Sequence, residues 1–161
     1  MENIDKLIRE IIPWPANVKN RMEFSNFHII DKLSESEKLQ VEIGLLEELK
    51  YSPNDMLIVE TLAYLKSTKS IDFLYKLLSE TTDNYEIVTI SSSIYRINKD
   101  KKLISIALNA VMKIPNERNL IWSFNELAKF NHRKTNKFIK SFFNHKDFII
   151  SYNAKRALNQ L

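Results

Sequence analysis

The sequence has no cysteine among its 161 residues, which excludes disulfide bonds and cysteine-ligated metals. It has a single glycine, Gly44, and only four prolines. Hairpin turns and phosphate-binding loops both depend on glycine, so this composition disfavours a β-sheet protein and nucleotide sites of the Walker or dinucleotide type. Scarce glycine favours helices instead.

Long apolar runs are also missing. No stretch approaches the roughly 18 uninterrupted apolar residues that a membrane span needs. Acidic residues are interleaved among the first six residues, and no apolar signal-peptide core follows them. We therefore expect a cytoplasmic protein without a membrane association, folded as a single domain over residues 1–161.

The chain does contain a repeat of about 32 residues. Apolar doublets recur at this interval, as Leu45-Leu46, Leu77-Leu78, Ala110-Val111 and Phe142-Phe143. Each doublet is followed a few residues later by a helix-start signal, namely Ser52-Pro53, Asp83-Asn84, Pro115-Asn116 and Asp147. A fixed period of this size is typical of stacked helix pairs.

Apolar spacing and capping signals predict ten helices. Their expected ranges are 2–12, 17–33, 36–50, 52–66, 70–80, 84–97, 101–113, 117–130, 135–144 and a last helix after Asp147. Ser34 and Glu37 form a capping-box pattern before the third helix. The first two helices, within residues 1–33, are expected to cap four helix pairs over residues 36–161, with Trp14 packed in that cap.

Equivalent positions of the four pairs carry apolar residues, as a shared core requires. Besides Leu39, the sequence predicts three buried columns: Val41, Phe73, Ile106 and Phe138; Leu62, Ile94, Leu127 and Leu158; Leu65, Ile97, Phe130 and Leu161. Gly44 lies inside a predicted helix, where glycine costs about 1 kcal/mol relative to alanine. Close approach of a neighbouring element would compensate this cost. A plain helical bundle remains the alternative architecture.

The repeat resembles HEAT-like repeats, particularly the short bacterial kind. The best local matches are residues 59–65, Val-Glu-Thr-Leu-Ala-Tyr-Leu, and residues 153–158, Asn-Ala-Lys-Arg-Ala-Leu. The usual glycine after the second helix and the frequent Val-Arg pair are absent. The resemblance implies an all-α fold, a right-handed α-solenoid of about four pairs, whose second helices line the concave side.

No catalytic or metal-binding pattern is evident. His28, His132 and His145 have no metal-ligand spacing and are expected to be exposed or to cap helices. The serines at 91–93 have no base nearby in the sequence and are interpreted as a polar helix face. We therefore expect no enzyme activity, no cofactor and no metal site.

The expected functional feature is the concave surface. The second helices place polar and aromatic residues in matching repeat positions opposite the core, and the candidate partner-binding residues are Glu60, Tyr64, Ser92, Arg96, Trp122, Asn125, Lys129 and Arg156. Trp122 stands out because it is out of phase with the core positions Phe124 and Leu127. Tryptophan, tyrosine and arginine are frequent binding hot spots.

Charge is unevenly distributed along the chain. Residues 1–80 hold 10 basic and 14 acidic residues, a net charge of −4, whereas residues 81–161 hold 14 and 6, a net charge of +8. Such a dipole predicts that one half prefers basic partners and the other acidic partners.

Three functional hypotheses follow. Size, helical repeats and the stretch Ile121–Leu127 resemble the all-helical immunity proteins of bacterial polymorphic-toxin and contact-dependent inhibition systems, which implies a protein-binding module that neutralises a cognate toxin domain. The second hypothesis is nucleic-acid binding by the basic half with Trp122 and Tyr152 interleaved. HEAT-like alkylpurine DNA glycosylases show by analogy that the architecture can host nucleic-acid binding. Their catalytic carboxylate has no counterpart that can be aligned with this sequence, in which Glu126 is the nearest acidic residue on the concave side. The third is a general scaffold or regulator.

Overall fold

The computed structural model describes residues 2–13 and 25–159, and in these ranges the chain is helical with no strand. The α-helices are α1 (Glu2–Ile11), α2 (Phe27–Ile30), α3 (Glu35–Tyr51), α4 (Met56–Tyr64), α5 (Ile71–Glu80), α6 (Asn84–Asn98), α7 (Lys102–Val111), α8 (Glu117–Ala128), α9 (Arg133–Lys140) and α10 (Phe148–Ala157). A short 3₁₀ helix, Thr68–Ser70, precedes α5. The predicted all-α class is confirmed for this part of the chain.

Capping side chains start four of the described helices at the predicted residues. Ser34 and Glu37 form the expected capping box, in which the Ser34 N–H donates to Glu37 Oε2 at 2.8 Å. Asp83, Asn116 and Asp147 cap α6, α8 and α10 by accepting backbone N–H groups. These caps satisfy N–H groups that the first helical turn leaves unpaired.

One predicted helix start is wrong. Asp55 caps α4 by accepting the N–H of Leu57, so the cap lies three residues after the expected cap at Ser52. An aspartate carboxylate is at least as good a cap as a serine hydroxyl. The residue before a proline also disfavours the helical conformation, which holds Ser52 and Pro53 outside the helix.

Helices α4, α6, α8 and α10 are each followed by a residue with a positive φ angle, a conformation that glycine usually adopts at a helix end. The positive φ angles in the described ranges belong to Lys66, Lys99, Asn131 and Asn159, at 54°, 61°, 46° and 54°. These residues follow α4, α6, α8 and α10, which recur at the sequence repeat. Each repeat therefore ends with a left-handed residue, a position that glycine occupies at the lowest energy.

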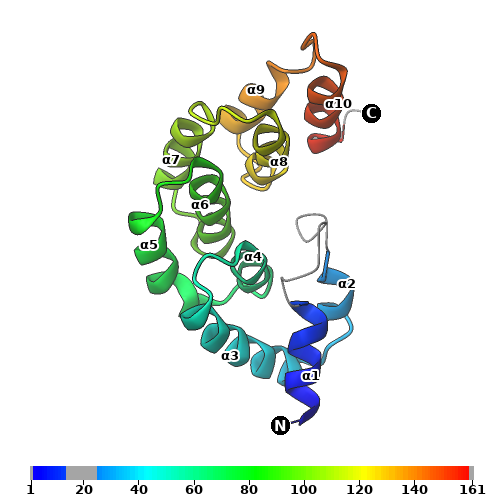
Figure 1. Ribbon diagram of the computed structural model, residues 1–161, viewed down its shortest axis with the longest axis vertical. Helices are drawn as coiled ribbons and strands as arrows, with labels where there is room; N and C mark the ends of the chain where they lie inside the picture. The colour runs from blue at the N-terminus through cyan, green and yellow to red at the C-terminus, as the bar shows by residue number, and fades with distance from the viewer. Residues whose placement is uncertain (1, 14–24, 160–161) are drawn as a thin grey trace.

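Figure 1 shows the helices following an arc in two layers. Helices α3, α5, α7 and α9 form the outer layer, and α4, α6, α8 and α10 form the inner one. Within the inner layer α4 packs on α6, α6 on α8 and α8 on α10, while α1 packs on α3 at the N-terminal end. The concave side of the arc is therefore built from the second helix of each pair.

The core lies between the two layers. Val41, Leu62, Ile94 and Leu127 are fully buried and belong to it, as the repeat columns predict. Two predictions of burial are wrong: Leu39 is 50% exposed and Ile106 is 40% exposed. Both lie on outer helices, whose far side faces solvent because no third layer covers it. Trp14, Leu161 and residues 17–24 of the predicted helix 17–33 lie outside the described residues, and the described remainder of that prediction is helical only over Phe27–Ile30.

Helix α6 is the most enclosed element. It packs against α4, α5, α7 and α8, and every residue from Val88 to Ile94 is buried. The serines at 91–93 were expected on a polar face, and this expectation is wrong because neighbouring helices cover α6 on all of its sides there. Their small side chains allow this close packing.

Gly44 has the close neighbour that its position in a helix predicts. A Cβ atom added there would clash with Cδ1 of Ile8 on α1. The absence of a side chain at Gly44 therefore lets α1 lie against α3, and the cost of glycine in a helix is offset by this packing.

Candidate functional site

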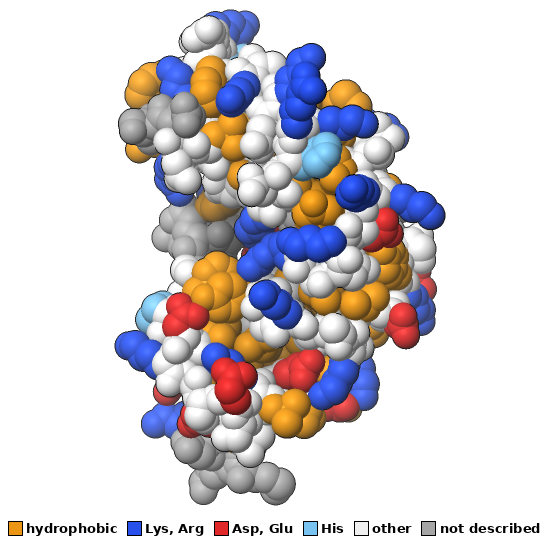
Figure 2. Space-filling model, turned by 180° about the vertical axis from the view of Figure 1, so that it is seen from behind, with side chains coloured by type: hydrophobic (Ala, Val, Ile, Leu, Met, Phe, Trp, Pro, Cys, Tyr) orange, Lys and Arg blue, Asp and Glu red, His pale blue; other side chains and the backbone are white. Residues whose placement is uncertain are grey.

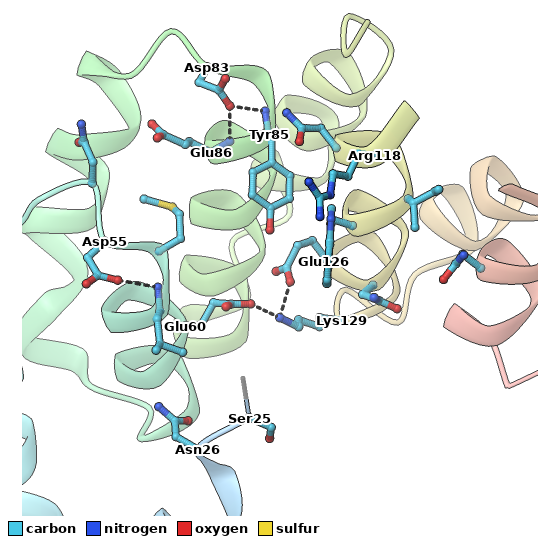
Figure 3. Close-up of a pocket in the computed structure, with 18 of the residues that line it drawn as sticks. Ser25, Asn26, Asp55, Glu60, Asp83, Tyr85, Glu86, Arg118, Glu126 and Lys129 are labelled. Atoms are coloured by element: carbon cyan, nitrogen blue, oxygen red, sulfur yellow. Dashed lines mark hydrogen bonds and ion pairs between the residues drawn. The ribbon is translucent and has the colours of Figure 1, made fainter. Parts of the chain in front are cut away.

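A cavity of about 910 Å³ lies on the concave side, between the inner helices and residues 25–27 (Figure 3). Its lining is polar and charged with a few aromatic rings. The lining residues are Ser25, Asn26, Phe27, Asn54, Asp55, Met56, Leu57, Glu60, Asp83, Tyr85, Glu86, Arg118, Asn119, Ile121, Trp122, Asn125, Glu126, Lys129, Asn153 and Arg156. All four inner helices contribute to it.

A partly buried ion network joins three of these helices inside the cavity. The ammonium of Lys129, the residue that follows α8, donates to Glu60 Oε1 on α4 at 2.6 Å and to Glu126 Oε1 at 2.5 Å. The Ser92 hydroxyl on α6 donates to Glu126 Oε2 at 2.6 Å. Two carboxylates thus share one ammonium, and one carboxylate is held further by a hydroxyl from the central helix.

This arrangement separates the pKa values of the two carboxyl groups. Burial and the neighbouring charge of Glu126 raise the pKa of Glu60 to about 7. Burial also disfavours ionisation of Glu126, but Lys129 and the Ser92 hydrogen bond outweigh it and lower the pKa of Glu126. Burial acts against the charge of Lys129, yet both carboxylates raise its pKa. Near neutral pH, Glu126 and Lys129 are ionised and Glu60 titrates.

Tyr85 at the start of α6 points its ring toward Glu126 in Figure 3. Burial, together with the charges of Glu126 and Glu60, raises the pKa of its phenol. The group therefore stays protonated and can donate a hydrogen bond into the cavity.

The charged residues that line the cavity are unevenly distributed among the helices. Asp55 and Asp83 cap α4 and α6 and lie at the N-terminal ends of these helices, with Glu86 one turn into α6. Arg118 on α8 and Arg156 on α10 lie on the side of the C-terminal helices. The lining residues at α4 and α6 that carry charge are thus acidic, whereas α8 and α10 contribute Arg118, Lys129 and Arg156 together with Glu126.

Five of the eight predicted site residues line this cavity. Glu60, Trp122, Asn125, Lys129 and Arg156 come together there, and Trp122 is half-buried, as its position out of phase with the core predicts. Ser92 was expected on the open side of its helix, but it is fully buried beneath α8 and reaches the site only through Glu126.

Tyr64 and Arg96 lie away from the cavity. The Tyr64 ring stacks on Phe27 at 4.0 Å between centroids, and its hydroxyl donates to Asp31 at 2.6 Å. The guanidinium carbon of Arg96 lies 5.9 Å from the centre of the same ring. Tyr64 thus holds α2 against α4, and its polar and aromatic faces are used within the chain.

The sequence analysis missed several lining residues. It would have found two of them by following each row of candidate binding positions, or stripe, further along its helix. Tyr85 precedes Thr89 and Ser92 on one side of α6, and Arg118 precedes Trp122 by one turn on α8. Extending each stripe by one turn toward the helix start includes both. Asn26 had no such signal, because it lies before the repeats and reaches the cavity only through the tertiary fold.

His132 caps α9, as the sequence analysis expects, whereas His145 bonds the backbone of the turn before α10. His132 Nδ1 accepts the N–H of Lys134 at 3.2 Å, and His145 Nδ1 accepts the N–H of Asp147 at 3.1 Å. Within residues 2–13 and 25–159 no group of His, Asp and Glu side chains has the arrangement of a metal site. None of the described helices is long and apolar enough to cross a bilayer.

Comparison with known proteins adds no relative. No model of a protein family, no curated protein and no solved structure matches this chain. The function is therefore argued from the cavity itself.

Proposed function

We propose that the chain is a protein-binding module whose concave cavity receives a segment of another protein. The observation that carries this proposal is that five predicted positions, from three of the four repeats, converge on one cavity of about 910 Å³. Trp122, Tyr85 and two arginines line it, and these residue types dominate the energy of protein interfaces. The cavity is large enough for several side chains of a partner.

The HEAT-like solenoid is part of this proposal. The recurrent left-handed residues, the two-layer arc and the stacking of successive inner helices support it. In such repeats, stacked neighbours create an extended concave binding surface, and the site is assembled from equivalent positions of several repeats.

In its more specific form the partner is a cognate toxin domain and the chain is its immunity protein. The resemblance of residues 121–127 to bacterial all-helical immunity proteins motivates this form. Four of those residues, Ile121, Trp122, Asn125 and Glu126, line the cavity. Neutralisation would follow from occupation of the toxin's active site or substrate path. The general scaffold is the broader form of the same proposal.

The test is affinity capture from the source cells with nuclease-treated and untreated lysate. The wild-type chain is compared with Trp122→Ala and with Phe148→Ala, an exposed aromatic of α10 that does not line the cavity. We expect one protein to be retained from both lysates. Trp122→Ala should weaken the binding of this protein at least roughly 30-fold, and Phe148→Ala should leave its binding unchanged. Capture that survives Trp122→Ala unchanged contradicts the concave site. Toxicity of the captured protein, relieved by this chain, tests the immunity form.

A second candidate function, nucleic-acid binding, is favoured by the basic outer surface. Exposed lysines and arginines on α7, α9 and the adjoining turns form no salt bridge with an acidic side chain in the described part of the chain: Lys101, Lys102, Arg133, Lys134, Lys137, Lys140 and Lys146. In Figure 2 the uppermost part of the molecule, which holds the C-terminal helices, shows Lys and Arg side chains without Asp or Glu among them. Phosphate contacts from such a surface would give salt-dependent binding.

Its test is retention of duplex and single-stranded nucleic acid at increasing salt. Binding that falls steeply by about 200 mM salt, and that Lys134→Gln with Lys137→Gln weakens, would support this second candidate. Absent retention at low salt contradicts it.

A further inference from the structure

We propose that a second copy of this chain docks on the protein, with helix α10 of one copy against helix α3 of the other. Eight large apolar side chains are exposed in the described part of the chain, and six of them belong to these two helices. The six are Leu39, Ile43 and Tyr51 on α3, and Phe148, Ile149 and Tyr152 on α10. Exposed apolar side chains that gather in one place mark an interaction surface, whereas scattered ones do not.

The surface on α10 is apolar where a stack of helices normally presents a polar face. α10 is the last helix of the described stack, and it packs on α8 and α9. Phe148 and Tyr152 lie one turn apart on its exposed side, with their ring centroids 5.8 Å apart, and Phe148 is 73% exposed. The outermost element of such a stack usually has a polar outer face, which keeps the protein soluble. The aromatic pair on α10 therefore favours a partner that covers it.

The charge around the α10 surface is almost entirely basic. Residues 131–159 hold seven basic residues and one acidic residue, Asp147, which gives a net charge of +6. Asp147 is the cap of α10, and none of the seven basic residues forms a salt bridge with an acidic side chain in the described ranges. In Figure 2 the uppermost part of the molecule shows apolar side chains beside Lys and Arg side chains. Two α10 surfaces would repel one another, so charge disfavours a symmetric contact between them.

The surface on α3 has the complementary character. Leu39 and Ile43 are four residues apart, which places them on one side of the helix, and both are about half exposed. α3 holds five glutamates and two lysines, a net charge of −3. With Lys69, which bonds Glu42 from the neighbouring 3₁₀ helix, the net charge is still −2. The apolar side chains of α3 are therefore surrounded by acidic charge.

The two surfaces lie toward opposite ends of one molecule, so they meet only between two copies. Figure 1 shows α3 toward the N-terminal end of the arc and α10 at the other end, and α4, α6 and α8 are stacked between them. In a contact between copies, the apolar side chains of α10 pack on those of α3 while the basic residues face the glutamates. Opposite charges of this kind favour the encounter and fix its orientation. None of the six exposed apolar residues lines the cavity, so the docking of a second copy does not depend on the proposed function.

Analytical ultracentrifugation of the full chain over a range of concentrations measures this association. Small surfaces of this kind bind weakly, so we expect a Kd of about 10–300 µM at about 50 mM salt. Association should be at least roughly threefold weaker at about 300 mM salt, because salt screens the opposite charges. A chain that stays monomeric up to about 1 mM, or an association that salt does not weaken, overturns the proposal.

Two variants distinguish a contact between unlike surfaces from a symmetric contact. Leu39→Gln with Ile43→Gln removes apolar side chains from α3, and Phe148→Gln with Tyr152→Gln removes them from α10. Glutamine keeps a good helix propensity at these positions. Each double variant alone should be monomeric, whereas a mixture of the two should form a complex, because one keeps an intact α10 surface and the other an intact α3 surface. Met112→Gln, at an exposed apolar residue outside both surfaces, is the control and should associate like the wild-type chain.

Self-association that survives either double change, or that mixing does not restore, overturns the proposal. Circular dichroism verifies that the variants are helical. If a double variant does not fold, Ile43→Gln or Phe148→Gln alone takes its place. An acidic protein captured through Phe148 by a chain that does not self-associate would assign the α10 surface to a different partner, and it would also overturn the proposal.

Discussion

Lys129 and Glu60 are separated by 69 residues in the sequence, yet their charged groups lie 2.6 Å apart inside the concave cavity. The first lies at the C-terminal end of α8 and the second belongs to α4, and α6 lies between these helices. The ion pair therefore spans the central repeat and ties the stability of the arc to the state of its candidate site. This coupling makes the site accessible to folding measurements even before a partner is known.

Replacing Lys129 by methionine should destabilise the fold, because Glu60 and Glu126 then face one another without a cation. Since Lys129 and Glu60 each keep a quarter of their side-chain exposure, we expect a loss of about 2–3 kcal/mol, below the full cost of breaking a buried pair. Both carboxyl groups would gain raised pKa values, so the loss should be larger at about pH 8 than at about pH 5. Urea unfolding at both pH values measures it. Lys137→Met, on the exposed side of α9, is the control, and an equal effect of both changes would contradict the assignment.

The wild-type chain should lose stability as the pH rises from about 5 to about 8. The pKa of Glu60 is raised in the folded state to about 7 from 4.5, so its contribution is complete at low pH and is lost as the pH rises through 7. We expect a decrease of roughly 1–2 kcal/mol across this range. The groups with lowered pKa values, Glu126 among them, change stability only at more acidic pH.

Glu60→Gln should abolish this decrease, while Glu47→Gln, on the exposed face of α3, should preserve it. Carbon-13 resonances of the Glu60 carboxyl report the same titration directly. A stability that is constant or increases over this range in the wild-type chain would contradict the raised pKa.

Lys99→Gly should stabilise the chain. Lys99 has a φ angle of 61°, in the left-handed region where a side chain costs about 1 kcal/mol relative to glycine. Because glycine also has greater freedom in the unfolded chain, the net gain should be about 0.5–1 kcal/mol. Thermal unfolding measures it. Lys137→Gly, at an exposed position inside α9, serves as the control and should be destabilising.

The effect of Gly44→Ala on the free energy of unfolding should change sign with the residue at position 8. In the wild-type chain the new methyl group meets Cδ1 of Ile8, so the helix-propensity gain of about 1 kcal/mol is cancelled or reversed. Ile8→Val removes that carbon, and in this background Gly44→Ala should be stabilising. The double-mutant cycle measures the coupling between the two positions. A coupling energy near zero would show that α1 does not approach α3 as closely as the structure has it.

The repeat made much of the fold predictable. Helix caps such as Asp83 and core residues such as Ile94 follow local rules of capping and periodicity, so their positions needed no tertiary information. Burial on the outer layer was predicted less well. Ile106 has the spacing of a core residue, but the sequence does not show that no third layer covers that side of α7.

The site was predictable only in part for a similar reason. The repeat columns located Trp122 and Lys129, since equivalent positions of a helix pair face the same side. They could not show that the Tyr64 side chain already contacts Phe27 and Asp31, or that Asn26 lines the cavity. Both relationships depend on how residues before the repeats pack. The pairing of Lys129 with Glu60 likewise arises from the curvature of the stack.

Photo-crosslinking from inside the cavity tests protein binding at this site most directly. A benzophenone side chain is placed at Asn125, which lines the cavity, and in a second variant at Lys137 on the outer face of α9. We predict that Asn125 captures one protein from nuclease-treated source cells and that Lys137 does not. Crosslinks formed only from Lys137, or from neither position while nucleic acid is retained, would contradict a concave protein-binding site.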